Sequence, residues 1–457
     1  MAAAQANVSE NSVRKVALAS FIGTAIEWYD YFLYGTAAAL VFPVLFFPES
    51  NPTTGILLSL ATFGVGFASR PLGGLIFGHF GDRIGRKAML VTTLLIMGIA
   101  TALIGILPTY QSVGILAPVL LVVLRIVQGF GVGGEWGGAV LMAVEHAPGG
   151  RRGFYGSWPQ MGVPAGLLLG TLALYVFTLL PEEAFLAWGW RIPFLLSVAL
   201  IGIGLYIRLA IAESPAFRRV QETNTEARMP IVDVFRTHLK EVLIAMGLRV
   251  AENGAFYVFS VFVLAYGVDT LGLSRTAILT ATLVAAAVEL FAVPFFGALS
   301  DRVGRRPIYL FGAVFTLLFA FPFFWLMNTE NIVLIVLAVV LALAVGHAAM
   351  YGPQGAFFAE LFGTRVRYSG ASTGYQLASI FAGALSPIIA VALAASFGWP
   401  AVAIQLGVMA LITIVAVVVA TETHMIDIEA EHGAERQLIE ESAGTVRTDG
   451  SPQPGPR

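Results

Sequence analysis

Two closely similar charged loops divide this chain into halves that repeat one another. The first loop reads Gly78-His-Phe-Gly-Asp-Arg-Ile-Gly-Arg-Lys87, and the second reads Gly297-Ala-Leu-Ser-Asp-Arg-Val-Gly-Arg-Arg306. Each copy lies between two long apolar segments. A duplicated half bounded by apolar helices is typical of secondary transporters. The repeat therefore predicts a membrane protein built from two similar halves.

The composition does not provide enough charge for a water-facing surface. Charged residues make up 12% of the 457 residues and apolar residues 57%, whereas soluble proteins carry about 25% charged residues. The net charge of −2 argues against a nucleic-acid partner. The chain has no cysteine, and its six histidines lack metal-ligand spacing. With no nucleophile–base set either, we expect no metal, no cofactor and no enzyme activity.

Twelve segments reach the roughly 20 apolar residues that a membrane span needs. Those of the first half are 16–42, 54–78, 87–107, 114–145, 153–179 and 191–211. Those of the second half are 240–268, 277–299, 308–327, 332–360, 368–396 and 399–421. They predict an all-α membrane protein with two pseudo-symmetric six-helix bundles, 16–211 and 240–421. Three polar segments complete the chain: an N-terminus at 1–15, a middle loop at 212–239 and a largely disordered tail at 422–457.

Basic residues gather on one side of the expected membrane. If both termini are inside, the inner loops hold most arginines of the loops, and the short outer loops hold little beyond Arg275. Cytoplasmic loops carry an excess of Lys and Arg in membrane proteins. The pattern predicts a multi-pass protein of the plasma membrane with both termini in the cytoplasm.

Charges recur at equivalent places in the two halves and predict a gate on the cytoplasmic side. The loop acids Asp82 and Asp301 correspond, and each precedes a span whose helix N-terminus favours an anion. We expect each to pair with a nearby arginine when the inner side is closed. The alternative is that the charges only cap helices and fix the orientation. The candidate gate residues are Asp82, Arg83, Arg86, Glu145, Arg152, Asp301, Arg302, Arg305, Glu360 and Arg367.

The loop Gly78–Lys87 resembles the signature between the second and third helices of the major facilitator superfamily. Other motifs resemble its metabolite:proton symporter branch: Glu27-Trp-Tyr-Asp30, Arg70-Pro-Leu-Gly-Gly, the run Arg125–Gly138, Gly189-Trp-Arg-Ile-Pro-Phe194 and Glu213-Ser-Pro. The resemblance covers residues 14 to about 421 and is strongest to shikimate-transporter-like members. It implies the major facilitator fold, a central cavity and proton-driven uptake. Because the branch also holds carriers of other carboxylates, proline and betaine, it does not name the substrate.

Charged residues at mid-depth of the spans predict the proton-coupling site. A charge at the bilayer centre costs at least about 2.5–3.5 kcal/mol, so it persists where it faces water or a partner. Counted along their helices, Asp30 and Arg125 both lie near mid-depth. We expect them to meet, and Asp30 to carry the proton, because movement of Arg125 would change its proton affinity. Glu27 and Glu135 are the alternatives for the proton, and a static Asp30–Arg125 ion pair is the alternative role.

Arg249 is predicted to hold a substrate carboxylate, because its guanidinium group suits bidentate recognition. The alternative is an i,i+3 ion pair with Glu252. We expect His347 to form an interhelical hydrogen bond, with proton relay as the alternative. Further polar and aromatic residues on facing spans are expected to complete the substrate site: Glu252, Asn253, Gln128, Gln160, Tyr257, Tyr351, Gln354, Tyr375 and Gln376.

Two more charges lie inside apolar spans. Arg70 is expected near the inner end of the second span, where it lines the inner vestibule or pairs with a carboxylate. Glu289 is the only charge of the eighth span, and its direction is not predicted.

Together these features predict a proton-coupled symporter that imports a small polar metabolite by alternating access, with an organic acid as the expected substrate. Its partners would be the substrate, protons and the lipid bilayer, and it is expected to act as a monomer. The alternatives are a proline/betaine-type zwitterion symporter and a proton-driven efflux antiporter.

Overall fold

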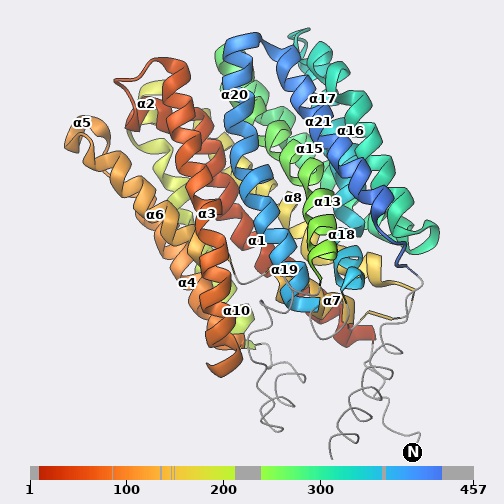
Figure 1. Cartoon of the computed structure of the whole chain (residues 1–457). Coiled ribbons are helices and arrows are strands. Elements are labelled where there is room, and N and C mark those ends of the chain that lie inside the picture. The colour runs from red at the N-terminus through yellow and green to blue at the C-terminus, as the bar shows by residue number, and fades with distance from the viewer. Residues whose placement is uncertain are drawn as a thin grey trace, which may run out of the picture.

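The computed structural model describes residues 10–84, 86–133, 136–145, 147–148, 150–210, 238–362 and 367–424. The regular elements in these ranges are all helices. Figure 1 shows them running side by side, with short helices α2 and α5 at one end of the bundle and α7 and α19 at the other.

The first half contains eleven described helices. They are α1 (Glu10–Leu40), α2 (Phe42–Phe46), α3 (Pro52–Ile84), α4 (Arg86–Gly105), α5 (Tyr110–Val113), α6 (Leu116–Val132), α7 (Trp136–Glu145), α8 (Arg152–Thr178), α9 (Glu182–Ala184), η1 (Phe185–Gly189) and α10 (Arg191–Ala210). The described second half consists of α13 (Leu239–Tyr257), η2 (Val258–Phe262), α14 (Val263–Ala265), η3 (Tyr266–Thr270), α15 (Arg275–Val303), α16 (Arg305–Met327), α17 (Ile332–Val340), η4 (Leu341–His347), α18 (Ala348–Leu361), α19 (Arg367–Ala378), η5 (Ser379–Ala384), α20 (Leu385–Phe397) and α21 (Trp399–Val419).

The predicted spans are confirmed as helices. Nine described helical runs are long and apolar enough to cross a membrane, and the bent pair Glu182–Gly189 and Arg191–Tyr206 makes ten if it is one span. The other two expected spans are α1 and α4; the apolar part of α4, Val91–Gly105, is shorter. The chain therefore has the all-α, multi-pass membrane architecture that its sequence predicts.

Glycines determine how closely α3 and α6 approach each other. A Cβ atom at Gly129 of α6 would lie 2.0 Å from the backbone oxygen of Gly66 in α3. A Cβ atom at Gly133 would lie 2.0 Å from the backbone oxygen of Arg70, and one at Gly66 would lie 2.5 Å from Nε of Arg125. Small residues allow membrane helices to come into direct contact. This contact brings the part of α3 that carries Arg70 close to the part of α6 that carries Arg125.

A second glycine contact joins the two halves. A Cβ atom on Gly153 of α8 would lie 2.4 Å from the backbone oxygen of Gly297 in α15, and one on Gly297 would lie 2.7 Å from the backbone oxygen of Gly153. The helices α8 and α15 therefore touch through their backbones.

Several second-half spans contain π-helical segments, and some of these segments carry buried polar residues. His347 is the last residue of η4, and Ser379 is the first residue of η5. Single π-helical turns inside α-helices are frequent at functional sites, because they rotate the following side chains relative to the helix.

The α3–α6 contact predicts a difference between two glycine-to-alanine variants. Gly129→Ala should lower stability by about 1–3 kcal/mol, because the added methyl group forces the two backbones apart. Gly202→Ala is the matched control, since a Cβ atom there meets nothing within 4 Å. Thermal unfolding of the two purified variants in the same detergent measures the difference. Equal melting temperatures would show that the close contact is not required.

Candidate functional site

The ion pair of Arg249 with Glu252 lies at the centre of a buried polar cluster in the second half. Nη1 of Arg249 donates to Oε2 of Glu252 at 2.9 Å and to Oε1 of Gln354 at 3.1 Å, and both charged side chains are 3% exposed. Nε donates to Oγ of Ser379 at 3.2 Å. The local pair considered from the sequence is therefore present, and Arg249 has a carboxylate partner in this conformation.

His347 lies between two carboxylates. Its Nε2 is 3.3 Å from Oε1 of Glu252, and its Nδ1 forms a short contact with Oε1 of Glu289. The three residues come from η4, α13 and α15, so the contacts join three helices. The expected interhelical hydrogen bond of His347 is confirmed. Gln354 completes the cluster by donating from Nε2 to Oε2 of Glu252 at 2.8 Å.

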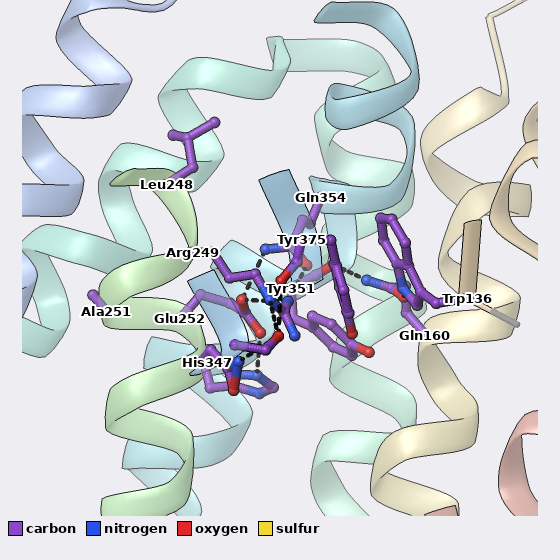
Figure 2. Close-up of polar contacts among 12 residues, drawn as sticks. Trp136, Gln160, Leu248, Arg249, Ala251, Glu252, His347, Tyr351, Gln354 and Tyr375 are labelled. Atoms are coloured by element: carbon purple, nitrogen blue, oxygen red, sulfur yellow. Dashed lines mark hydrogen bonds and ion pairs between the residues drawn. The ribbon is translucent and has the colours of Figure 1, made fainter. Parts of the chain in front are cut away.

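Aromatic stacking links this cluster to the first half. The guanidinium carbon of Arg249 lies 3.3 Å from the ring centroid of Tyr375, and that ring stacks on Trp136 of α7 with centroids 3.7 Å apart. Figure 2 shows Tyr375 between the guanidinium group and the indole. Nε1 of Trp136 donates to Oε1 of Gln160 at 2.9 Å, and Nε2 of Gln160 approaches the backbone oxygen of Tyr351 at 3.4 Å.

Arg125 is buried in the first half, with an amide and three rings around it. Nη1 donates to Oε1 of Gln128 at 3.0 Å. The guanidinium carbon lies 4.2 Å from the ring centroids of both Tyr31 and Tyr34 and 4.8 Å from that of Phe63. Within the described residues, its Nη2 has no hydrogen-bond partner and no carboxylate pairs with it.

Arg70 shares the ring of Tyr31 with Arg125. Its guanidinium carbon lies 4.3 Å from that ring centroid, 4.7 Å from the centroid of Phe67 and 5.3 Å from that of Trp28. The side chain is 1% exposed, and in the described part of the chain Nε and Nη2 lack hydrogen-bond partners. Among the described residues, its guanidinium group thus lies over aromatic rings and forms no ion pair with a carboxylate.

These two arginines are close to the junction of the halves. The ring of Phe67, which Arg70 covers, packs edge-on against Tyr257 of α13 with centroids 5.2 Å apart. A Cβ atom at Gly383 of η5 would lie 2.7 Å from the same phenylalanine ring. The first-half arginines are therefore one aromatic layer away from the second half.

Asp30 does not pair with Arg125 in this conformation. The carboxylate of Asp30 is buried and accepts a short hydrogen bond from Oγ of Ser197 in α10. The expected meeting of the two charges is thus not seen, because Arg125 lies over the tyrosine rings. Glu27 is buried in the same helix, and the alternative Glu135 lies outside the described residues.

The remaining residues of the predicted substrate site are buried at helix contacts. Nε2 of Gln128 donates to Thr101 at 2.6 Å, and Nδ2 of Asn253 donates to Ser379 at 3.3 Å. Nε2 of Gln376 crosses between the halves and donates to the backbone oxygen of Gly133 at 3.0 Å.

Sequence reasoning left Arg70 and Glu289 out of its candidate site. Each is an isolated charge inside an apolar span, and that alone marks a functional candidate. The sequence pattern does not show in which direction these two side chains point, and that direction determines which residues they contact.

The described part of the predicted gate forms an ion-pair network centred on Arg305. Nη1 of Arg305 donates to Oδ1 of Asp301 at 2.8 Å, and its Nη2 and Nε donate to the two oxygens of Glu360 at 3.1 Å. Asp301 also accepts from the backbone N–H groups of Gly153 and Phe154 at 2.8 and 2.9 Å. It thereby caps the first turn of α8, so a second-half carboxylate holds a first-half helix.

The N-terminus of α16 has a different acid than expected. Asp301 lies in the last turn of α15, and the backbone N–H groups of Arg305 and Arg306 donate instead to Glu422, beyond the last span, at 2.9 and 3.0 Å. Partial burial raises the pKa of the Glu422 carboxyl, but these backbone donors outweigh it and bring the pKa below its usual range. Thr423 donates to Glu360 at 2.7 Å, which ties the same segment to the network.

Several gate candidates lie outside what the structure describes. The side chains of Asp82, Arg83, Arg86, Glu145 and Arg367 are among these. Arg302 is exposed, and Arg152 is the first residue of α8. The first-half loop therefore remains a prediction, and only its second-half counterpart is described.

Comparisons with known proteins identify relatives along most of the chain. The model of the Major Facilitator Superfamily matches residues 20–384 and 290–449. A shikimate transporter of Escherichia coli (strain K12) is 44% identical over 88% of this chain and 93% of its own. The inner membrane metabolite transport protein YhjE of the same organism is 42% identical over 90% and 95%.

More distant similarities agree on the fold. A proline/betaine transporter of Salmonella typhimurium (strain LT2) is 36% identical over 84% of this chain and 78% of its own. The solved structure of a proton:xylose symporter, XylE, superposes with a TM-score of 0.72 at 16% identity, covering 92% of this chain and 98% of its own.

The Asp301 cap predicts how the contact between α8 and α15 opens. Asp301→Ala should expose it, because losing a helix cap costs about 1 kcal/mol, which is roughly a fivefold change in an equilibrium. A single cysteine at Ser157, a buried position facing Gly297, can report this, since the native chain has no cysteine. Its maleimide labelling rate should rise about fivefold. Glu241→Ala, which removes a half-exposed partner of His238, is the control, and equal rates in the two variants would contradict the capping role.

Proposed function

The chain belongs to the major facilitator superfamily, and we propose that it is a proton-coupled symporter that imports a small organic anion. Membership makes it a transport protein rather than an enzyme. The names of the relatives, a shikimate transporter and metabolite transport proteins, support a small metabolite as the substrate. The proton:xylose symporter with the same fold supports coupling to protons.

The proposal of an anionic substrate rests on two buried arginines that form no ion pair with a carboxylate of the described residues. Arg70 and Arg125 lie on one ring, that of Tyr31, and three of their guanidinium nitrogens have no hydrogen-bond partner among the described residues. Aromatic rings offset part of the cost of a buried cation. A guanidinium group forms its strongest hydrogen bonds with carboxylates. A substrate carboxylate would supply the missing acceptors and neutralise the charge.

Because Arg249 is already paired with Glu252, we do not propose it as the residue that binds the substrate carboxylate. Its guanidinium group already donates to Glu252 and Gln354 and stacks on Tyr375. A carboxylate bound there would have to displace Glu252. We therefore propose Arg70 and Arg125 for the substrate carboxylate, with the tyrosines and amides of both halves as its surroundings.

A zwitterion is the second candidate, because relatives named proline/betaine transporters are 36% and 37% identical over 84% of this chain, and one named a glycine betaine/proline/ectoine/pipecolic acid transporter is 38% identical. The same arginines would hold its carboxylate. In the described residues, however, the rings of Trp28, Tyr31 and Phe67 are covered by Arg70, so they do not offer a free face to an ammonium group.

We further propose that two halves, 16–211 and 240–421, move against each other around this site in a monomer. With both termini in the cytoplasm, the Asp301–Arg305–Glu360 network would lie on the inner side. Its cap on α8 would hold the inner side closed until the substrate and proton are bound.

The substrate class can be tested by ligand-dependent thermal stability. We expect at least one of shikimate, succinate, benzoate, proline and betaine to raise the melting temperature, and the amide or ester of an active acid to be inactive. Arg70→Lys should lose most of this stabilisation, because an ammonium group lacks the planar donor pair. The matched control is Arg191→Lys, a ring-stacked arginine that donates to backbone oxygens of Gly105 and Leu107. Stabilisation by neutral compounds alone would refute the anionic substrate.

The role of Asp30 can be tested by separating coupling from exchange. Asp30→Asn should abolish accumulation driven by a proton gradient, because an amide does not titrate, and should retain exchange of substrate across the membrane. Uptake into proteoliposomes of a compound that stabilises the protein, with and without a gradient, measures both. Accumulation at the wild-type level would remove Asp30 from the coupling site and direct attention to Glu27.

A further inference from the structure

The imidazole of His347 has a carboxylate at each of its ring nitrogens. Nε2 faces Glu252 at 3.3 Å, and Nδ1 contacts Glu289. Each such contact needs a proton between nitrogen and oxygen, since two lone pairs would otherwise face each other. The three side chains are 0–3% exposed, so water does not take the place of a missing proton.

The charges of the cluster balance in only one state of protonation. With a proton in both contacts, one imidazolium and Arg249 offset the carboxylates of Glu252 and Glu289. Loss of one proton leaves a net negative charge inside the membrane, which is costly without a partner or water. The proton would therefore leave only when the surroundings change.

One atom of the cluster remains without a partner. Oε2 of Glu289 has no hydrogen-bond partner within the described chain although it is buried. Its sister oxygen contacts His347. Oε2 is thus the atom at which an additional proton or a water molecule would find a free acceptor.

We propose that Glu252, His347 and Glu289 form a second proton-binding site of the transport cycle, in the opposite half of the chain from Asp30. This proposal rests on the proposed transport function. The exchanged proton resides in the contact between Glu289 and His347, and Glu252 and Arg249 balance the remaining charge. The proton is bound when the cluster is closed, as here, and is released when the helices of the second half separate.

The groups packed around the site are few. From α13, Arg249 donates to Glu252, and Phe256 packs on the imidazole with ring centroids 4.5 Å apart. From α18, Gln354 donates to Glu252, and the ring of Tyr351 stacks on His347 with centroids 4.9 Å apart. Beyond these, Tyr309 of α16 accepts from Gln354, and Tyr375 of α19 lies under Arg249.

The site has a mechanical connection to the junction of the halves. When the imidazolium loses the proton that it shares with Glu289, the neutral ring can still donate from Nε2 to Glu252, but its positive charge is gone and the charge of Glu252 is balanced by Arg249 alone. That same guanidinium group lies on Tyr375, which stacks on Trp136 of the first half. A change of protonation therefore acts on the contact between α7 and α19.

The test uses the cysteine at Ser157 in otherwise complete, purified protein, without any substrate. Its maleimide labelling rate is divided by the rate in the unfolded protein at the same pH, which removes the titration of the thiol itself. In the parent protein we expect this ratio to change roughly fivefold or more between mildly acidic and mildly alkaline pH. Glu289→Gln should abolish the change, since its amide does not titrate.

Further variants keep the outcome interpretable. His347→Gln should also give a flat profile, whereas Asp30→Asn should keep a pH-dependent one. Glu241→Gln, in the half-exposed pair with His238, makes the same substitution outside the cluster and should behave as the parent. All variants are first shown to be monodisperse.

Three results would overturn the second proton site. These are a flat parent profile, an unchanged profile in folded Glu289→Gln and His347→Gln, and a profile that Asp30→Asn alone abolishes. Because no ligand is used, these results are separate from a failure of the anionic-substrate proposal, which is read from ligand-dependent melting.

Discussion

The ion pair between Arg249 and Glu252 determines what the other buried charges can do. It joins a cation and a carboxylate on one face of α13 at 2.9 Å, and Gln354 hydrogen-bonds both. A charge in the apolar interior is costly unless it is paired. Since the charges of Arg249 and Glu252 cancel, His347 and Glu289 are two further titratable groups beside a neutral pair. Among the buried arginines of the described chain, Arg70 and Arg125 are left without a carboxylate partner.

Close backbone contact explains how two cations come to share one ring. Gly66 and Gly129 bring α3 and α6 together, so Arg70 and Arg125 approach the ring of Tyr31 from neighbouring helices. Like charges repel, so the two guanidinium groups are expected to destabilise each other when no anion is bound between them. A bound carboxylate would relieve this repulsion, and the relief would make the free energy of substrate binding more favourable.

The sequence predicted the spans well and gave the local ion pair as the alternative role of Arg249, since apolar length and i,i+3 spacing are properties of single helices. It did less well with contacts between helices. Asp30 was expected to meet Arg125, yet it binds Ser197 of a helix far along the chain. Glu422 takes the place expected for Asp301 at α16. Both depend on how helices rotate and approach, which one chain's periodicity does not encode.

The described segment after the last span is part of the folded unit. Val419 closes α21, but Glu422 holds the first turn of α16 and Thr423 bonds Glu360. A chain cut at Val419 would keep every described helix but lose the hydrogen bonds that Glu422 and Thr423 make to Arg305 and Glu360. For protein engineering, a truncated variant should therefore keep the chain at least through Thr423.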